Sequence, residues 1–140
     1  MEENKSILIV DDEFGVRESL KMILKPIYVV HTAANGEEAL QCIQKEKIDL
    51  VTLDLGMPGL SGLEVLREIK KNHPGIEAVI ITAYGSRENA MEATRYGAEF
   101  VDKPFNVPDI LISLNKSIEK QRYNLKLKNF GLYNSLVVRN

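Results

Sequence analysis

Four short apolar runs in this chain each lead into a polar residue suited to binding phosphate or a metal ion. Residues 7–10 run into Asp11 and Asp12, 50–53 into Asp54, 79–81 into Thr82, and 100–101 through Asp102 into Lys103. Short unbroken apolar runs suit parallel strands that are covered on both faces, and open parallel sheets bind ligands beyond the carboxyl ends of their strands. We therefore expect three carboxylates, a hydroxyl and an ammonium group to meet at one edge of one sheet.

Strand-like runs alternate with helical patterns along the whole chain. This alternation is typical of a parallel sheet whose strands are joined by crossover helices, so the expected fold class is α/β. The expected strands lie near residues 6–10, 27–32, 48–53, 78–82 and 98–101. The expected helices cover residues 14–25, 61–73 and 86–96, and another begins at residue 35. The last helix begins near residue 107 and is longer than such a domain requires.

The chain has the size and composition of one soluble domain. Its 140 residues are 44% hydrophobic and 27% charged, which is ordinary for a globular protein. The sequence contains neither an apolar run long enough to span a membrane nor a signal-peptide pattern. The single cysteine, Cys42, cannot form an internal disulfide, which suits a reducing compartment. We expect a cytoplasmic protein without membrane contact.

Charge is divided unevenly between the body of the chain and its tail. From Lys116 onward there are six basic residues and one acidic residue, a net charge of +5, whereas the preceding residues carry −7. An acidic body is a poor surface for nucleic acid. The basic tail is read as the solvated face of a helix, so we expect no direct binding of nucleic acid.

The clustered carboxylates predict a site for a hard cation and for phosphoryl chemistry. Three nearby carboxylates favour either proton uptake or a bound cation, and oxygen-only ligands select an ion such as Mg²⁺. In this interpretation Asp11 and Asp12 hold the metal and Asp54 is the nucleophile. Lys103 and Thr82 then contact the phosphoryl oxygens, where positive charge and hydrogen bonds are needed. Taken singly, each residue has a plainer role: Asp12 as a helix cap, Asp54 in a turn, and Lys103 on the surface.

These residues, in this order, resemble the receiver domain of two-component response regulators. The matching motifs are Asp11-Asp12, Asp54 with Met57-Pro58-Gly59 and Gly62, Thr82-Ala83, and Lys103-Pro104-Phe105, within about residues 5–120. The resemblance implies a five-stranded, doubly wound, flavodoxin-like sheet of order 2-1-3-4-5. It also implies that a sensor histidine kinase phosphorylates Asp54, with Mg²⁺ held by Asp11, Asp12, Asp54 and the Gly56 carbonyl. A cis peptide bond is expected before Pro104. The chain would assist its own phosphorylation and dephosphorylation, and would not be an enzyme acting on other substrates.

The resemblance further implies a conformational switch between Thr82 and Phe100. Phosphorylation draws the hydroxyl toward the phosphate, and the aromatic ring turns inward, which changes the surface of the fourth helix, fifth strand and last helix. Many members have tyrosine where this chain has Phe100, so the inward position here must depend on packing. Gly56 has no side chain to control water access, which leaves that role to neighbours such as Tyr84.

Two other classes of protein also place an acidic or phosphate-binding site at such a sheet edge. A haloacid-dehalogenase-like phosphatase uses a strand-end aspartate, Mg²⁺, a hydroxyl and a lysine. It also needs a second acid two residues after the nucleophile, where this chain has Gly56. A flavodoxin-like cofactor carrier needs a loop rich in Ser, Thr and Gly after the first strand, where this chain has Asp11, Asp12 and Glu13.

The length of the last helix indicates which kind of receiver this chain resembles, one followed by an output domain or one that stands alone. We assign residues 1–120 to the receiver and 121–140 to a helical extension, linker or tail. The extension and the segment 55–66 are similar to receivers of enhancer-binding transcription activators, in which case an output domain follows residue 140. The alternative is a stand-alone receiver of the phosphorelay or chemotaxis type. The chain itself has neither a P-loop nor a helix-turn-helix.

Apolar residues of the last helix also indicate how the chain assembles. Apolar residues recur with the spacing of a helix seam at Leu111, Leu114, Ile118 and Leu125. The first part of this seam is expected to pack on the sheet of its own domain. Leu125 would stay exposed on an isolated helix, so we expect a homodimer through the last helix.

Overall fold

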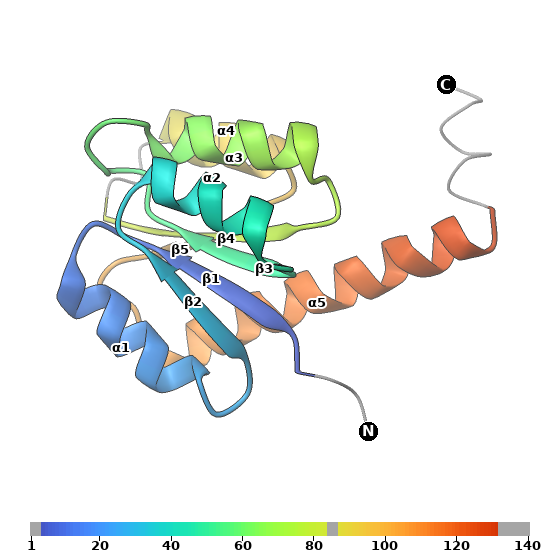
Figure 1. Ribbon diagram of the computed structural model, residues 1–140, viewed down its shortest axis with the longest axis horizontal. Coiled ribbons are helices and arrows are strands. Elements are labelled where there is room, and N and C mark those ends of the chain that lie inside the picture. Colours follow the sequence, from blue (N-terminus) through green and yellow to red (C-terminus); the bar gives the residue numbers. More distant parts are fainter. Residues whose placement is uncertain (1–3, 84–86, 132–140) are drawn as a thin grey trace.

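The computed structural model describes residues 4–83 and 87–131 as one parallel sheet flanked by helices. Within these residues the five strands follow the order β2-β1-β3-β4-β5 (Figure 1). Their bounds are β1 (Ser6–Val10), β2 (Val29–Ala33), β3 (Leu50–Leu53), β4 (Glu77–Thr82) and β5 (Glu99–Asp102). The expected fold class and strand order are confirmed.

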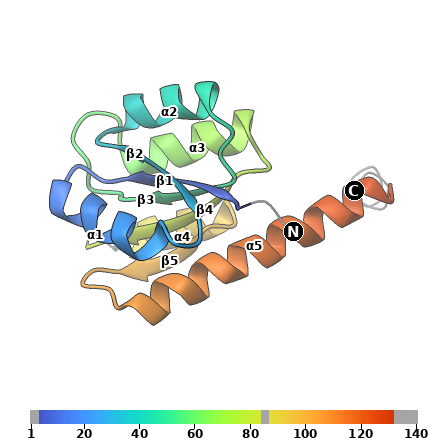
Figure 2. The same cartoon turned by 60° about the horizontal axis from the view of Figure 1, so that its bottom comes forward.

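Helices cover both faces of the sheet, as Figures 1 and 2 show. The helices of the described residues are α1 (Phe14–Leu24), α2 (Gly36–Lys45), α3 (Gly62–Asn72), α4 (Arg87–Arg95) and α5 (Val107–Asn129). Successive side chains of a strand point to opposite faces, so the strands supply two cores. Leu8 and Val10 of β1 pack with α2, α3 and α4, whereas Ile7 and Ile9 pack with α1 and α5.

The second strand begins two residues later than its apolar run. The sequence predicts a strand over 27–32, but pairing with β1 starts at Val29 and continues to Ala33. The amide groups of Ile27 and Tyr28 instead donate to the carbonyl of Leu24 and complete the end of α1. Apolar character alone does not distinguish a residue that closes a helix from one that opens a strand.

Side-chain caps fix where α2 and α3 begin. Asn35 Oδ1 accepts a hydrogen bond from the Glu38 amide at 2.9 Å, and Ser61 Oγ accepts one from the Glu64 amide at 3.2 Å. Each cap satisfies a backbone donor that the first helical turn leaves without a partner. The helix starts expected at Asn35 and Ser61 are confirmed, and the loops that precede them are thereby held at the carboxyl edge of the sheet.

The last helix packs on the sheet for only part of its length. Ile110 and Leu114 are buried, whereas Leu111 is 37% and Leu125 is 55% exposed. The apolar seam expected from the sequence is therefore divided between the core and the surface. Figure 2 shows the end of α5 projecting beyond the sheet. Among the described helices, none combines the length and apolar character that crossing a membrane requires.

Candidate functional site

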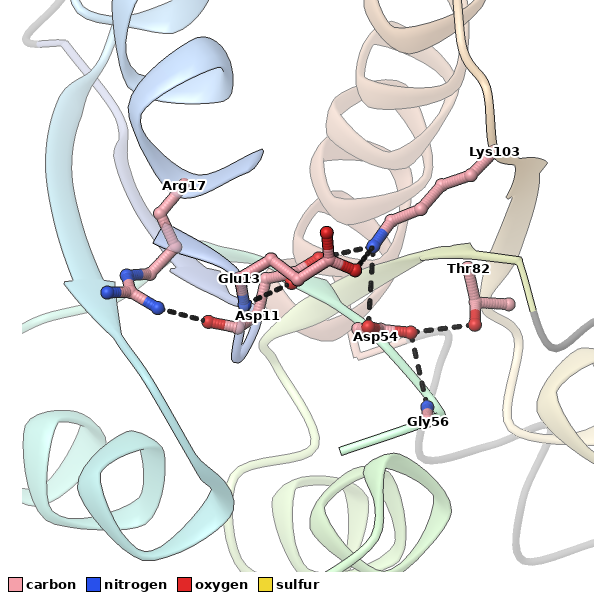
Figure 3. A network of polar contacts seen from close by, with 7 residues as sticks. All are labelled: Asp11, Glu13, Arg17, Asp54, Gly56, Thr82 and Lys103. Atoms are coloured by element: carbon pink, nitrogen blue, oxygen red, sulfur yellow. Dashed lines mark hydrogen bonds and ion pairs between the residues drawn. The ribbon is translucent and has the colours of Figure 1, made fainter. Parts of the chain in front are cut away.

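The phosphate- and metal-handling side chains expected from the sequence all lie at the carboxyl edge of the sheet. They are Asp11 and Asp12 after β1, Asp54 after β3, Thr82 at the end of β4 and Lys103 after β5. Hydrogen bonds between neighbouring strands continue to the strand ends: the Asp54 amide donates to the carbonyl of the last residue of β1 at 3.1 Å, and the Lys103 amide donates to the Thr82 carbonyl at 3.0 Å. Figure 3 shows four of these side chains converging from four separate strand ends.

Asp54 lies at the centre of this cluster and is only 3% exposed. Its Oδ1 accepts hydrogen bonds from Thr82 Oγ1 at 2.7 Å and from the Gly56 amide at 3.1 Å. Its Oδ2 lies 3.3 Å from Lys103 Nζ. Both oxygens of this buried carboxylate are thus engaged by donors from different elements, which fixes its orientation.

Lys103 bridges the two buried aspartates. Its ammonium lies 2.7 Å from Asp11 Oδ2 as well as close to Asp54, and its side chain is 12% exposed. Burial on its own lowers the pKa of Lys103, but its hydrogen bond to Asp11 and the charges of Asp11 and Asp54 outweigh burial and raise that pKa above the usual value. The peptide bond between Lys103 and Pro104 is cis, as expected.

Asp11 is held from both sides and is 2% exposed. Its Oδ1 accepts a hydrogen bond from the Glu13 amide at 2.9 Å, while Oδ2 faces Lys103. Burial raises the pKa of the Asp11 carboxyl above its usual value, and the contact with Lys103 only partly offsets this effect. Asp12, the next residue, is exposed.

Three carboxylates here have the chemistry and nearly the spacing of a magnesium site. One oxygen each from Asp11, Asp12 and Asp54 lies within 4.8 Å of the others. Ligands on opposite sides of Mg²⁺ are about 4 Å apart, because each bond is about 2 Å long. The set therefore fits the ion after a small contraction, and the exposed side of Asp12 leaves room for water ligands.

The loop after Asp54 is pressed closely against the start of α3. A β-carbon at Gly62 would lie 2.2 Å from the carbonyl oxygen of Asp54, far inside van der Waals contact. Only glycine permits this approach of helix to loop. Gly62, which the sequence motif already includes, thus helps to place the backbone that carries Asp54 and Gly56.

Phe100 lies on β5 next to Ile80 of β4 and is partly buried against the core. With Pro104 and Ile112 it also lines a surface cavity of about 390 Å³ between β5 and α5. The ring therefore lies at the boundary between the interior and this surface. Tyr84, which we expected to influence water access, falls outside the described residues.

Two neighbours of the site were not expected from the sequence. Arg17 Nη1 donates to the carbonyl oxygen of Asp11 at 2.7 Å, and the exposed Glu13 carboxylate lies 3.9 Å from Lys103 Nζ. The position of Arg17 in the sequence pattern of α1 is the same as that of a solvent-exposed arginine. The sequence therefore does not indicate this contact. Figure 3 shows both residues beside Asp11.

Comparison with known proteins gives one consistent result. The family model of the response regulator receiver domain matches residues 7–115. Sporulation initiation phosphotransferase F of Bacillus subtilis is 39% identical over 115 residues, which cover 81% of this chain and 93% of that protein. The CheY-like receiver domain protein of Methanospirillum hungatei JF-1 is similar in structure, with a TM-score of 0.83, 33% identity and coverage of 87% and 99%. NtrX of Brucella abortus has a TM-score of 0.84 and 32% identity, but the match covers 91% of this chain and only 30% of that one.

Proposed function

Because this chain belongs to the response regulator receiver family, we propose that Asp54 accepts a phosphoryl group from the phosphohistidine of a sensor histidine kinase. One Asp54 carboxylate oxygen attacks phosphorus, the bond from phosphorus to the imidazole nitrogen breaks, and the imidazole leaves. The observation that carries the proposal is the buried Asp54 carboxylate, which faces a hydroxyl, an ammonium and two further carboxylates. The family is a signalling phosphoacceptor family, so the phosphatase alternative is not retained.

Each neighbour of Asp54 has a separate role in this proposal. The carboxylates of Asp11, Asp12 and Asp54 and the Gly56 carbonyl would hold Mg²⁺, which when bound neutralises charge on the phosphoryl oxygens. Lys103 and Thr82 already touch Asp54, so either can turn to a phosphoryl group attached there. Such a donor and cation stabilise the charge that develops on the equatorial oxygens.

Phosphorylation then acts as a local charge change with a distant effect on packing. It adds roughly −1.5 to −2 charge at Asp54. Thr82 moves toward the new oxygens, and Phe100 moves inward from the boundary that it occupies, which alters the face formed by α4, β5 and α5. We expect chemical-shift changes on that face after phosphorylation. Changes confined to the neighbourhood of Asp54 would contradict the switch.

The end of α5 supports an output role through pairing of two chains. Tyr123 and Leu125 of α5 are 63% and 55% exposed, and Phe130, directly after the helix, is 78% exposed. A helix that projects from its domain is marginal alone in water. We propose a homodimer through this segment, followed by an output domain as in the much longer NtrX. The alternative is a stand-alone receiver, as in the relative that this chain spans almost completely. Sedimentation of the full chain with and without a phosphoryl mimic separates the two, because a monomer under both conditions would exclude the dimer.

Phosphorylation of one named residue tests the proposed function. Incubation with a small phosphodonor and Mg²⁺ should add one acid-labile phosphoryl group, and Asp54→Asn should abolish it. Asp102→Asn is the matched control, because Asp102 also ends a strand but is exposed and lies outside the cluster. Equal labelling of Asp54→Asn and wild type would show that the phosphoacceptor is another residue.

A further inference from the structure

The loop between β1 and α1 presents the only exposed member of the three-carboxylate cluster, Asp12. Its neighbours on both sides are fixed by hydrogen bonds. The Asp11 amide donates to the Ala33 carbonyl at 3.2 Å, and the Glu13 amide donates to Asp11 Oδ1 at 2.9 Å. These contacts hold the loop from β2 and from within. From α1, the Arg17 amide donates to the Glu13 carbonyl at 3.1 Å, but this backbone bond does not reach Asp11 or Asp12.

The side chain of Arg17 adds a contact from α1 to the residue that precedes Asp12. Its guanidinium extends back from α1 and donates to the carbonyl oxygen of Asp11 at 2.7 Å. The same guanidinium lies over the ring of Phe14, 5.6 Å from the ring centre, which restricts its position further. Because Arg17 is part of α1 and Asp11 directly follows β1, this hydrogen bond spans the loop that carries Asp12.

The charge of Arg17 by itself opposes a bound cation. Like charges repel, so a guanidinium beside the loop lowers the affinity of the site for Mg²⁺ on electrostatic grounds alone. A residue that only contributed charge would therefore weaken the site. A residue that holds the loop would strengthen it, because carboxylates already in place lose less freedom when the ion binds. The two roles predict opposite signs when Arg17 is removed.

We propose that Arg17 is a positioning residue for the metal site: its bond to the Asp11 carbonyl keeps Asp12 beside Asp11 and Asp54. This inference rests on the proposed binding of Mg²⁺ to these three carboxylates. Arg17 does not touch the ion or the phosphoryl group. It acts through the backbone of the loop, and Phe14 acts through Arg17.

Calorimetric titration of Mg²⁺ into the full chain tests this role. Arg17→Ala should weaken Mg²⁺ binding about tenfold, the lower end of the range for residues that act on metal ligands from outside. Arg17→Lys keeps the charge and can donate one hydrogen bond, so it should recover part of the affinity. Phe14→Ala should weaken binding by a smaller factor. The control is Lys21→Ala, which removes a positive charge from an exposed position on α1 and should leave the affinity within about twofold.

Amide hydrogen exchange gives a second measurement that needs no metal. In Arg17→Ala the Glu13 amide should exchange faster than in wild type, while amides of β3 should be unchanged. Unchanged Mg²⁺ binding by Arg17→Ala would overturn the positioning role, and tighter binding would leave only the charge effect. If Arg17→Ala does not fold, the Mg²⁺ affinity of Phe14→Ala tests the proposal instead. Phe14 is 68% exposed, so its removal should not disturb the core.

The proposed function fails separately from this inference. If wild type binds Mg²⁺ and Asp54→Asn loses that binding, the metal site stands whatever Arg17 does. Equal affinity of wild type and Arg17→Ala would then reject the role of Arg17 alone. Absence of Mg²⁺ binding by wild type would reject the metal site itself, and the role of Arg17 with it.

Discussion

Lys103 lies closer to Asp11 than to the proposed phosphoacceptor, with its ammonium 2.7 Å from Asp11 Oδ2 and 3.3 Å from Asp54 Oδ2. The ammonium thus neutralises the two buried carboxylates that would also hold Mg²⁺. A bound Mg²⁺ and the lysine would therefore compete for these two carboxylates. The sequence indicated a lysine that contacts the phosphoryl group, but this competition depends on the distances in the folded chain.

Removing Lys103 should therefore strengthen metal binding while weakening the metal-free fold. We expect Lys103→Ala to bind Mg²⁺ more tightly than wild type in calorimetry. Without Mg²⁺ it should lose roughly 3 kcal/mol in the free energy of unfolding, since two buried carboxylates lose their counter-charge. Lys71→Ala, at an exposed position of α3, is the control and should change neither quantity. Weaker Mg²⁺ binding by Lys103→Ala would show that the lysine does not compete with the ion.

The hydroxyl of Thr82 should matter both to stability and to the switch. Thr82→Val keeps a similar volume but removes the 2.7 Å hydrogen bond to Asp54, which should lower the free energy of unfolding by about 2 kcal/mol. Thr82→Ser retains the hydroxyl and should recover most of this loss. After phosphorylation, Thr82→Val should show smaller chemical-shift changes at Phe100 than Thr82→Ser does. Equal responses from the two variants would argue against a role for the hydroxyl in the switch.

We expect the stability of the fold to depend on pH through Lys70, which lies at the amino edge of the sheet, opposite the carboxylate cluster. Burial lowers the pKa of Lys70 below its usual 10.5, although its ammonium lies 3.6 Å from the Glu77 carboxylate; Lys120, which is 3.5 Å from the same carboxylate, lowers it further. The unfolded chain then holds this proton more tightly than the folded chain, so stability should rise with pH in the interval just below pH 10.5. We expect wild type to gain stability relative to Lys70→Met across that interval. Parallel stability curves in denaturant unfolding would contradict a lowered pKa.

Gln121 should mark the last residue that stabilises the receiver itself. Its Nε2 donates to the carbonyls of Asp49 at 2.9 Å and Gly75 at 3.0 Å, and its Oε1 accepts from Lys5 Nζ at 3.0 Å. A chain ending at Lys120 should therefore be about 1–3 kcal/mol less stable than one ending at Tyr123. Both lack Leu125, so both should be monomeric in sedimentation. Equal stability of the two chains would place the boundary at residue 120, where the sequence suggested it.

The sequence alone determined the sheet and the membership of the cluster at its carboxyl edge. Unbroken apolar runs alternating with helical patterns leave few arrangements other than a parallel sheet, and in such a sheet all strands end at the same edge. The sequence alone therefore predicts that four side chains lie together, those of Asp11, Asp54, Thr82 and Lys103. Local chemistry also sufficed for the helix starts at Asn35 and Ser61, because a cap depends only on residues within one turn.

Contacts between side chains and the backbone of other elements were decided only by the tertiary structure. No pattern distinguishes Arg17 from a solvent-exposed arginine, or Gln121 from a polar residue on a free helix. Their partners, the carbonyls of Asp11, Asp49 and Gly75, are backbone groups that every residue carries. The shorter contact of Lys103 with Asp11 than with Asp54 likewise depends on distances that differ by less than an ångström. Sequence periodicity reports which face of an element is buried, whereas these hydrogen bonds depend on how the elements are positioned against one another.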